Sequence, residues 1–198
     1  MSLKISNLTK SFDKKSILKD FSYSFNDNGI YVIKGESGAG KTTLLRMIAG
    51  LDKNYTGSIE GGGIGMVGMA FQEYRLFPQL SALDNIVFAN SDEKDEAVLK
   101  KAKRMLIHLG FKNEDLTLLP SELSGGMKQR VSLVRAFLSD FPILLFDEPT
   151  KELDENNAKK VRDIITMLSK EKLILIVSHN SEDISELNAT EINIQIAY

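Results

Sequence analysis

The sequence predicts an α/β fold with a mainly parallel sheet, an N-terminal antiparallel β subdomain and an inserted α-helical subdomain. Two continuous apolar runs, 143–146 and 173–177, are typical of strands covered on both faces of a parallel sheet. The segment 156–169 between them has a helical pattern, so the three segments predict a right-handed βαβ unit. A third apolar run, 30–33, leads into a glycine-rich segment and then a helix.

The N-terminal segment 3–25 has a strand-like pattern. Phe21, Tyr23 and Phe25 alternate with serines, and this period of two predicts a half-buried antiparallel strand. The turn cluster 26–29 separates that strand from the buried strand 30–33. A helix is expected after the glycine-rich segment, ending at Gly50, and the triplet 61–63 is expected to form a turn between strands.

The middle of the chain changes character. The segment 83–110 is polar and charged, and its apolar residues are spaced as one helical face; these are Val98, Ala102, Met105, Leu106 and Leu109. We therefore expect an all-helical insertion between Gln72 and Ser124. The basic residues Lys100, Lys101, Lys103 and Arg104 are expected on its solvated outer face. For the end of the chain, 191–198, one further strand is expected, with no regulatory domain after it.

Composition narrows the class of protein. The chain has 198 residues, 42% of them hydrophobic, which is enough for one compact domain. Its net charge of −2, from 25 basic and 27 acidic residues, does not indicate nucleic-acid binding, and no nucleic-acid partner is expected. The chain has no cysteine, which excludes disulfides and Cys-based zinc sites. The N-terminus lacks a signal-peptide pattern and no apolar run is long enough for a bilayer, so we expect any membrane role to come through a partner.

The glycine-rich segment fits the P-loop pattern that binds nucleotide phosphates. Its glycines let backbone N–H groups surround a phosphate, and the following helix N-terminus adds positive potential. Lys41 is expected to reach the β- and γ-phosphates, Thr42 to coordinate Mg²⁺ and Thr43 to contact the α-phosphate. The predicted nucleotide-binding residues here are Gly35, Glu36, Ser37, Gly38, Ala39, Gly40, Lys41, Thr42 and Thr43. The alternative is a glycine-rich strand–helix turn without a ligand.

The apolar run 143–146 ends in two carboxylates, Asp147 and Glu148. Ligands of α/β sheets bind at the carboxyl ends of strands, so Asp147 is expected to engage Mg²⁺. Glu148 is expected to face the γ-phosphate and polarise the attacking water as a general base. The alternative is an ordinary acidic pair that caps a turn before Pro149.

A second anion-binding pattern lies downstream, in the segment 123–130 (Leu-Ser-Gly-Gly-Met-Lys-Gln-Arg), where Ser-Gly-Gly opens a helix. With the P-loop and the acidic strand end, this segment resembles the signature sequence of the ATP-binding cassette (ABC) ATPases. The resemblance implies a nucleotide-binding core, 1–72 and 136–198, and a helical subdomain, 73–135, that ends in the signature helix. It also implies a head-to-tail dimer, in which Ser124, Gly125 and Gly126 cap the ATP held by the other copy's P-loop.

The resemblance extends to other positions. Gln72 matches the glutamine that senses Mg²⁺ or γ-phosphate, Asp154 the D-loop residue at the dimer interface, and His179 the histidine that contacts γ-phosphate. Phe12 matches the aromatic ring that stacks on adenine, although a core phenylalanine is the competing interpretation. The implied catalytic residues are thus Glu148, His179, Gln72 and Lys41, and the implied Mg²⁺ ligands are Thr42, Gln72 and Asp147. Lys151 departs from the family, which has a small residue there, and His108 is interpreted as structural.

The resulting functional hypothesis is an ATP-hydrolysing subunit of a transporter whose integral membrane permease subunits are separate chains. Its expected location is the cytoplasmic face of the cell membrane, with a solute-binding protein as a possible further partner. A groove formed by Tyr74, Leu76, Phe77 and Pro78 is expected to receive a helix of the permease, although these residues could equally be core. The alternatives are a soluble ABC ATPase unrelated to transport and a non-hydrolysing dimerisation module. A GTPase is disfavoured because the Asn-Lys-x-Asp guanine motif is absent.

Overall fold

The structure, a computed structural model, describes residues 3–12, 15–90 and 95–194. A five-stranded parallel sheet runs through its centre in the order β5-β6-β7-β3-β8. The strands are β3 (Gly29–Lys34), β5 (Val67–Ala70), β6 (Ile143–Asp147), β7 (Leu173–Val177) and β8 (Thr190–Asn193). The expected mainly parallel sheet is confirmed. Of the strand expected at 191–198, residues 195–198 lie outside the described part.

Continuous apolar runs form the central strands because both faces of the sheet are covered. In β6, Leu144 and Phe146 pack into one hydrophobic cluster, whereas Ile143 and Leu145 pack into another on the opposite face. Every residue of β6 and β7 is buried. A strand with one solvated face would instead alternate apolar and polar residues.

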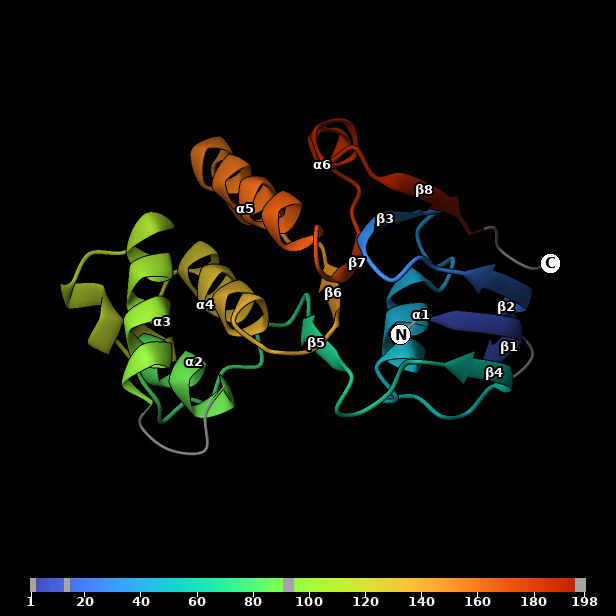
Figure 1. Cartoon of the computed structure of the whole chain (residues 1–198), viewed down its shortest axis with the longest axis horizontal. Helices are drawn as coiled ribbons and strands as arrows, with labels where there is room; N and C mark the ends of the chain where they lie inside the picture. The colour runs from blue at the N-terminus through green and yellow to red at the C-terminus, as the bar shows by residue number, and fades with distance from the viewer. Residues whose placement is uncertain (1–2, 13–14, 91–94, 195–198) are drawn as a thin grey trace.

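An antiparallel sheet of three strands lies at one end of the molecule (Figure 1). It consists of β1 (Lys4–Phe12), β2 (Lys15–Ser24) and β4 (Thr56–Glu60), in the order β2-β1-β4. Its buried side chains share a cluster with helix α1 (Lys41–Ile48) and with one face of the parallel sheet. The N-terminal antiparallel β subdomain is therefore confirmed.

Helices gather at the opposite end of the molecule (Figure 1). They are α2 (Ala82–Asn90), α3 (Glu96–His108), the 3₁₀ turns η1 (Glu114–Thr117) and η2 (Pro120–Glu122), and α4 (Gly125–Phe137). Together with α5 (Glu155–Leu168) they cover the second face of the sheet, and α6 (Ser181–Glu186) follows β7. Helix α3 buries Ala102 and Leu106, as its periodicity predicted. Within the described residues, no helix combines the length and the apolar character that crossing a membrane requires.

Candidate functional site

The glycine-rich segment forms a loop between β3 and α1, where the backbone turns without side chains. Gly38 and Gly40 have φ values of 83° and 85°, which lie in the left-handed region that glycine adopts without strain. A Cβ atom on Gly40 would lie 2.3 Å from Cγ2 of Ile17 in β2. Gly40 is also the N-cap of α1, and no side chain caps that end of the helix. The first turn of α1 therefore keeps N–H groups that suit an anion.

Lys41, the first residue of α1, lies against the loop that it follows. Its Nζ donates hydrogen bonds to the carbonyl oxygens of Gly35 and Glu36, at 2.7 and 2.9 Å. Burial lowers the pKa of this ammonium group, while the carboxylates of Glu148 and Asp147 oppose the shift. The side chain thus holds its positive charge against the carbonyl oxygens at the start of the loop.

Thr42 and Asp147 meet beneath the loop. The Thr42 hydroxyl donates a hydrogen bond of 2.8 Å to Oδ2 of Asp147, whose side chain is almost fully buried. Burial raises the pKa of Asp147, opposed first by the hydrogen bond from Thr42 and then by Arg46, Lys41 and Lys151. A carboxylate and a hydroxyl in contact are oxygen ligands of the kind that Mg²⁺ takes. The two residues therefore fit the predicted Mg²⁺ site.

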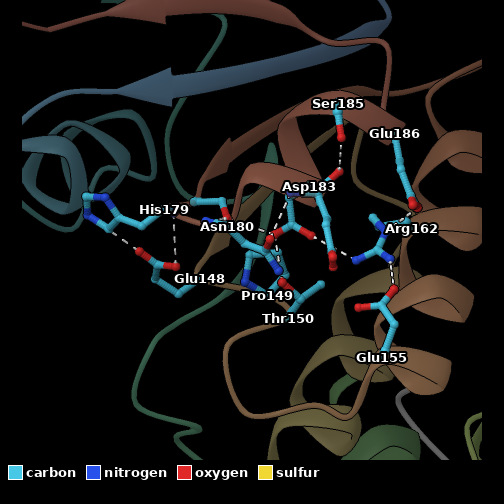
Figure 2. A network of polar contacts seen from close by, with 12 residues as sticks. Glu148, Pro149, Thr150, Glu155, Arg162, His179, Asn180, Asp183, Ser185 and Glu186 are labelled. Atoms are coloured by element: carbon cyan, nitrogen blue, oxygen red, sulfur yellow. Dashed lines mark hydrogen bonds and ion pairs between the residues drawn. The ribbon is translucent and has the colours of Figure 1, made fainter.

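Glu148 follows β6 in an unusual backbone conformation, with φ of 54°. Such a conformation is strained for a residue with a Cβ atom, and surrounding contacts must hold it. The Glu148 N–H donates to the carbonyl oxygen of Val177, at 2.8 Å. Its carboxylate accepts a 3.4 Å hydrogen bond from the N–H of His179 and lies 3.7 Å from Nε2 of that ring (Figure 2).

Gln129 in helix α4 also holds this turn, and sequence analysis gave it no role. Its buried side-chain amide donates to the carbonyl oxygens of Glu148 and Pro149, at 3.3 and 3.2 Å. Gln129 lies one turn beyond the Ser-Gly-Gly start of α4. The helix that carries the signature segment is therefore tied to the strained turn that carries Glu148.

These groups surround one cavity of about 500 Å³. Its lining residues are Ile17, Ser37, Gly38, Gly40, Lys41, Thr42, Thr43, Gln72, Asp147, Glu148, Lys151, Val177 and His179. The structure thus brings together the P-loop, the acidic strand end, Gln72 and His179. Ile17, Lys151 and Val177 line it without having been predicted there. The predicted residues that do not line it are Gly35, Glu36, Ala39, Ser124, Gly125, Gly126, Asp154 and Phe12.

The Ser-Gly-Gly segment lies at the start of α4 against the chain's own segment 151–154. Ser124 caps the helix by accepting a hydrogen bond of 3.3 Å from the N–H of Met127. A Cβ atom on Gly125 would lie 2.2 Å from Oε2 of Glu152, and one on Gly126 would lie 2.7 Å from its carbonyl oxygen. A side chain at position 126 would displace the backbone of Glu152, whereas Gly125 faces the movable carboxylate of the same residue.

Tyr74 completes this junction. Burial, followed by a hydrogen bond to Glu152, raises the pKa of Tyr74 to about 12. The segment after Gln72, the signature helix and the segment after Glu148 therefore meet at one carboxylate. The spacing of these residues along the sequence does not predict this contact.

Asp154 and Phe12 have local roles in the structure. Asp154 is the N-cap of α5: its carboxylate accepts hydrogen bonds from the backbone N–H and side-chain amide of Asn157, which lower its pKa. Phe12 ends β1 with half of its surface exposed. The Nζ of Lys10, held by Asp52, lies 4.5 Å from the centre of the Phe12 ring. An exposed ring supported in this way suits stacking on a planar ligand.

Comparison with known proteins gives consistent matches. A protein-family model described as ABC transporter matches residues 18–151. The aliphatic sulfonates import ATP-binding protein SsuB of Bacillus licheniformis is 37% identical over 196 residues, covering 92% of this chain and 76% of that protein. The sulfate/thiosulfate import ATP-binding protein CysA of Escherichia coli strain K12 is 34% identical, covering 94% of this chain. The chain spans 56% of the length of CysA.

Solved structures match over nearly the whole chain. A dimeric structure of the ATP-binding cassette MJ0796, in a post-hydrolysis state bound to ADP and Pi, superposes with a TM-score of 0.84. It is 25% identical in sequence, and the match covers 99% of this chain and 97% of the other. A second dimeric structure of MJ0796, a bacterial ABC transporter cassette, also gives a TM-score of 0.84. The fold therefore agrees with that of this cassette.

Proposed function

The chain belongs to the ABC transporter family and is an ATPase, and on that premise we propose that it drives a transporter whose membrane-spanning subunits are separate chains. The observation that carries the hydrolytic part of this proposal is the cavity in which the P-loop, Asp147, Glu148 and His179 converge. A fold of this class alone would not indicate hydrolysis. The convergence of a phosphate-binding loop with a carboxylate and an imidazole supports it.

We assign the chemistry to the chain's own residues. The loop N–H groups and the Lys41 ammonium bind and orient the β- and γ-phosphates of ATP, and Thr43 contacts the α-phosphate. Glu148 accepts a proton from the attacking water. His179, whose Nε2 lies 3.7 Å from the carboxylate of Glu148, helps to hold that carboxylate in place. Thr42, Gln72 and Asp147 would hold Mg²⁺, which when bound neutralises charge on the phosphates.

A second copy of the chain completes the site in this proposal. The Ser-Gly-Gly start of α4 is a second anion-binding helix end, yet it does not line the chain's own cavity. A head-to-tail pair would place Ser124, Gly125 and Gly126 of each copy on ATP held by the other, with Asp154 at the interface and Phe12 against adenine. The dimeric state of the MJ0796 cassette supports this arrangement. ATP binding would then close the pair, and hydrolysis would reopen it.

The proposed direction of transport is import, and the proposed location is the cytoplasmic face of the cell membrane. SsuB and CysA are both import proteins by name, which supports partnership with permease subunits and a solute-binding protein. The docking surface we propose lies beside Tyr74, around Phe77. The rings of Phe77 and Phe88 are exposed by 40% and 64%, and they pack edge to face at 5.2 Å. Such an exposed aromatic pair suits a helix of the permease.

The test is Glu148→Gln, which keeps the shape of the side chain but removes the base. The variant is expected to bind MgATP, to lose about 10²- to 10⁴-fold in turnover, and to accumulate as an ATP-bound dimer. Glu171→Gln, an exposed change after α5, is the matched control and should behave like the parent. ATP hydrolysis by Glu148→Gln at the parental rate, measured by phosphate release, would refute the assignment.

A further inference from the structure

A buried carboxylate outside the cavity joins the two catalytic loops. Asp183, in the short helix α6, is fully buried and does not line the cavity. Its Oδ2 atom accepts a hydrogen bond of 2.7 Å from the hydroxyl of Thr150 (Figure 2). The same atom accepts a second hydrogen bond of 2.7 Å from the hydroxyl of Ser178. A single oxygen atom therefore binds side chains from two separate segments.

Each of those segments carries a residue of the catalytic pair. Thr150 lies two residues after Glu148, and Ser178 lies directly before His179. Both hydroxyl residues are buried. The segments follow the neighbouring strands β6 and β7, whose register pairs Asp147 with Val177. Asp183 therefore links the two loops just beyond the residues at which β6 and β7 stop pairing.

The loop that carries Glu148 needs such an anchor. The φ of 54° at Glu148 is unfavourable, and it persists only where neighbouring contacts determine it. The Glu148 N–H donates to the carbonyl oxygen of Val177, and the carbonyl oxygens of Glu148 and Pro149 accept hydrogen bonds from the side chain of Gln129. Thr150 supplies the anchor on the downstream side, through Asp183.

Arg162 of α5 holds Asp183 in place from the other side. Its Nη1 lies 3.4 Å from Oδ1 of Asp183, so the two carboxylate oxygens have different partners. Arg162 also binds Glu155 and Glu186 (Figure 2). Burial alone would lower the pKa of Arg162, but its hydrogen bonds to Glu155 and Glu186 raise it. The buried carboxylate thus faces a guanidinium that stays charged.

We propose that Asp183 is a positioning residue for ATP hydrolysis, which sets the relative placement of Glu148 and His179 through Thr150 and Ser178. The inference rests on the proposed function, because it concerns the same base and histidine. Asp183 does not line the cavity. Its loss should therefore slow the chemical step more than it weakens nucleotide binding, since a displacement of about 1 Å can cost about 10²-fold in rate.

The test uses variants that leave Asp183 paired with Arg162. Ser178→Ala and Thr150→Val each remove one hydroxyl and keep the buried ion pair, so they should fold. Each is expected to lower kcat by about 10- to 100-fold, with the Kd for MgATP changed by less than about two-fold. Asp183→Asn is the direct variant. Glu186→Gln, which removes an exposed partner of Arg162 but contacts neither loop, is the control and should retain the parental kcat.

The double variant distinguishes one shared contact through Asp183 from two independent contributions of Thr150 and Ser178. If one oxygen joins both loops, removing either hydroxyl breaks this contact, so Ser178→Ala with Thr150→Val should be little slower than the slower single variant. Rate losses that multiply would overturn the inference, as would a parental kcat in either single variant. If those variants are fully active while Glu148→Gln is inactive, only this inference fails. Full activity of Glu148→Gln would overturn the proposed function, and the inference with it.

Discussion

Replacing Gln129 with methionine tests whether the signature helix holds the Glu148 turn. Methionine has a similar length but no N–H groups, so the hydrogen bonds of 3.3 and 3.2 Å to Glu148 and Pro149 are lost. A typical hydrogen bond contributes about 0.5–1.5 kcal/mol net, so two predict a loss of about 1–3 kcal/mol in the free energy of unfolding. For a domain of this size, each kcal/mol lowers Tm by roughly 2–4 °C.

The assay combines denaturant unfolding with steady-state ATPase activity. The midpoint should fall at an unchanged m-value, and kcat should fall as well, because the φ of Glu148 is no longer held on that side. Lys128→Met, at the adjacent and less buried position of α4, is the control and should change neither quantity much. A parental midpoint together with a parental kcat in Gln129→Met would refute the reasoning.

Three further predictions concern charges in and near the cavity. Lys41→Ala should abolish most of the rise in Tm that MgATP produces, because ligands that bind only the folded state stabilise it; an undiminished rise would contradict the role of the P-loop. Lys151→Gln should weaken MgATP binding about 2- to 5-fold at low salt and less at high salt, because an exposed cation is screened, whereas Lys159→Gln should have no effect in the same titrations. The contribution of Tyr74 to the free energy of unfolding should be fully present below pH 10 and be lost as the pH rises towards 12, because its folded pKa is raised to about 12. Tyr74→Phe should remove this pH-dependent contribution from unfolding curves. The same pH dependence in the variant and the parent would count against the contact with Glu152.

The parts of the fold that sequence predicted are those with a local physical signal. Leu144 and Leu145 are adjacent and both apolar because they enter different clusters on opposite faces of the sheet. The signal for the P-loop is equally local, since Gly40 and Lys41 lie at the start of the helix that follows the loop. Spacing alone could therefore indicate both the strands and the phosphate-binding loop.

The contacts that hold the site depend on packing between distant segments. Gln129 is one polar residue in a helix, and nothing nearby in the sequence shows that it will bind two carbonyl oxygens after β6. Asp183 lies 33 residues from Thr150, which it binds. Glu152 covers Gly125 only because α4 and the segment after β6 lie side by side. Sequence predicted the groups to which we assign the chemistry, but not the groups that hold them.

The buried polar residues around the Glu148 turn explain how a strained residue is kept in place. Burying Gln129, Asp183 or Arg162 costs desolvation free energy that an apolar core would avoid. An apolar core at this place would stabilise the fold as well, but it would leave the turn free to relax from a φ of 54°. Hydrogen bonds are directional, so they fix the backbone where non-directional packing cannot. The polar core and the strained residue therefore depend on each other, and together they place the carboxylate of Glu148 beside His179.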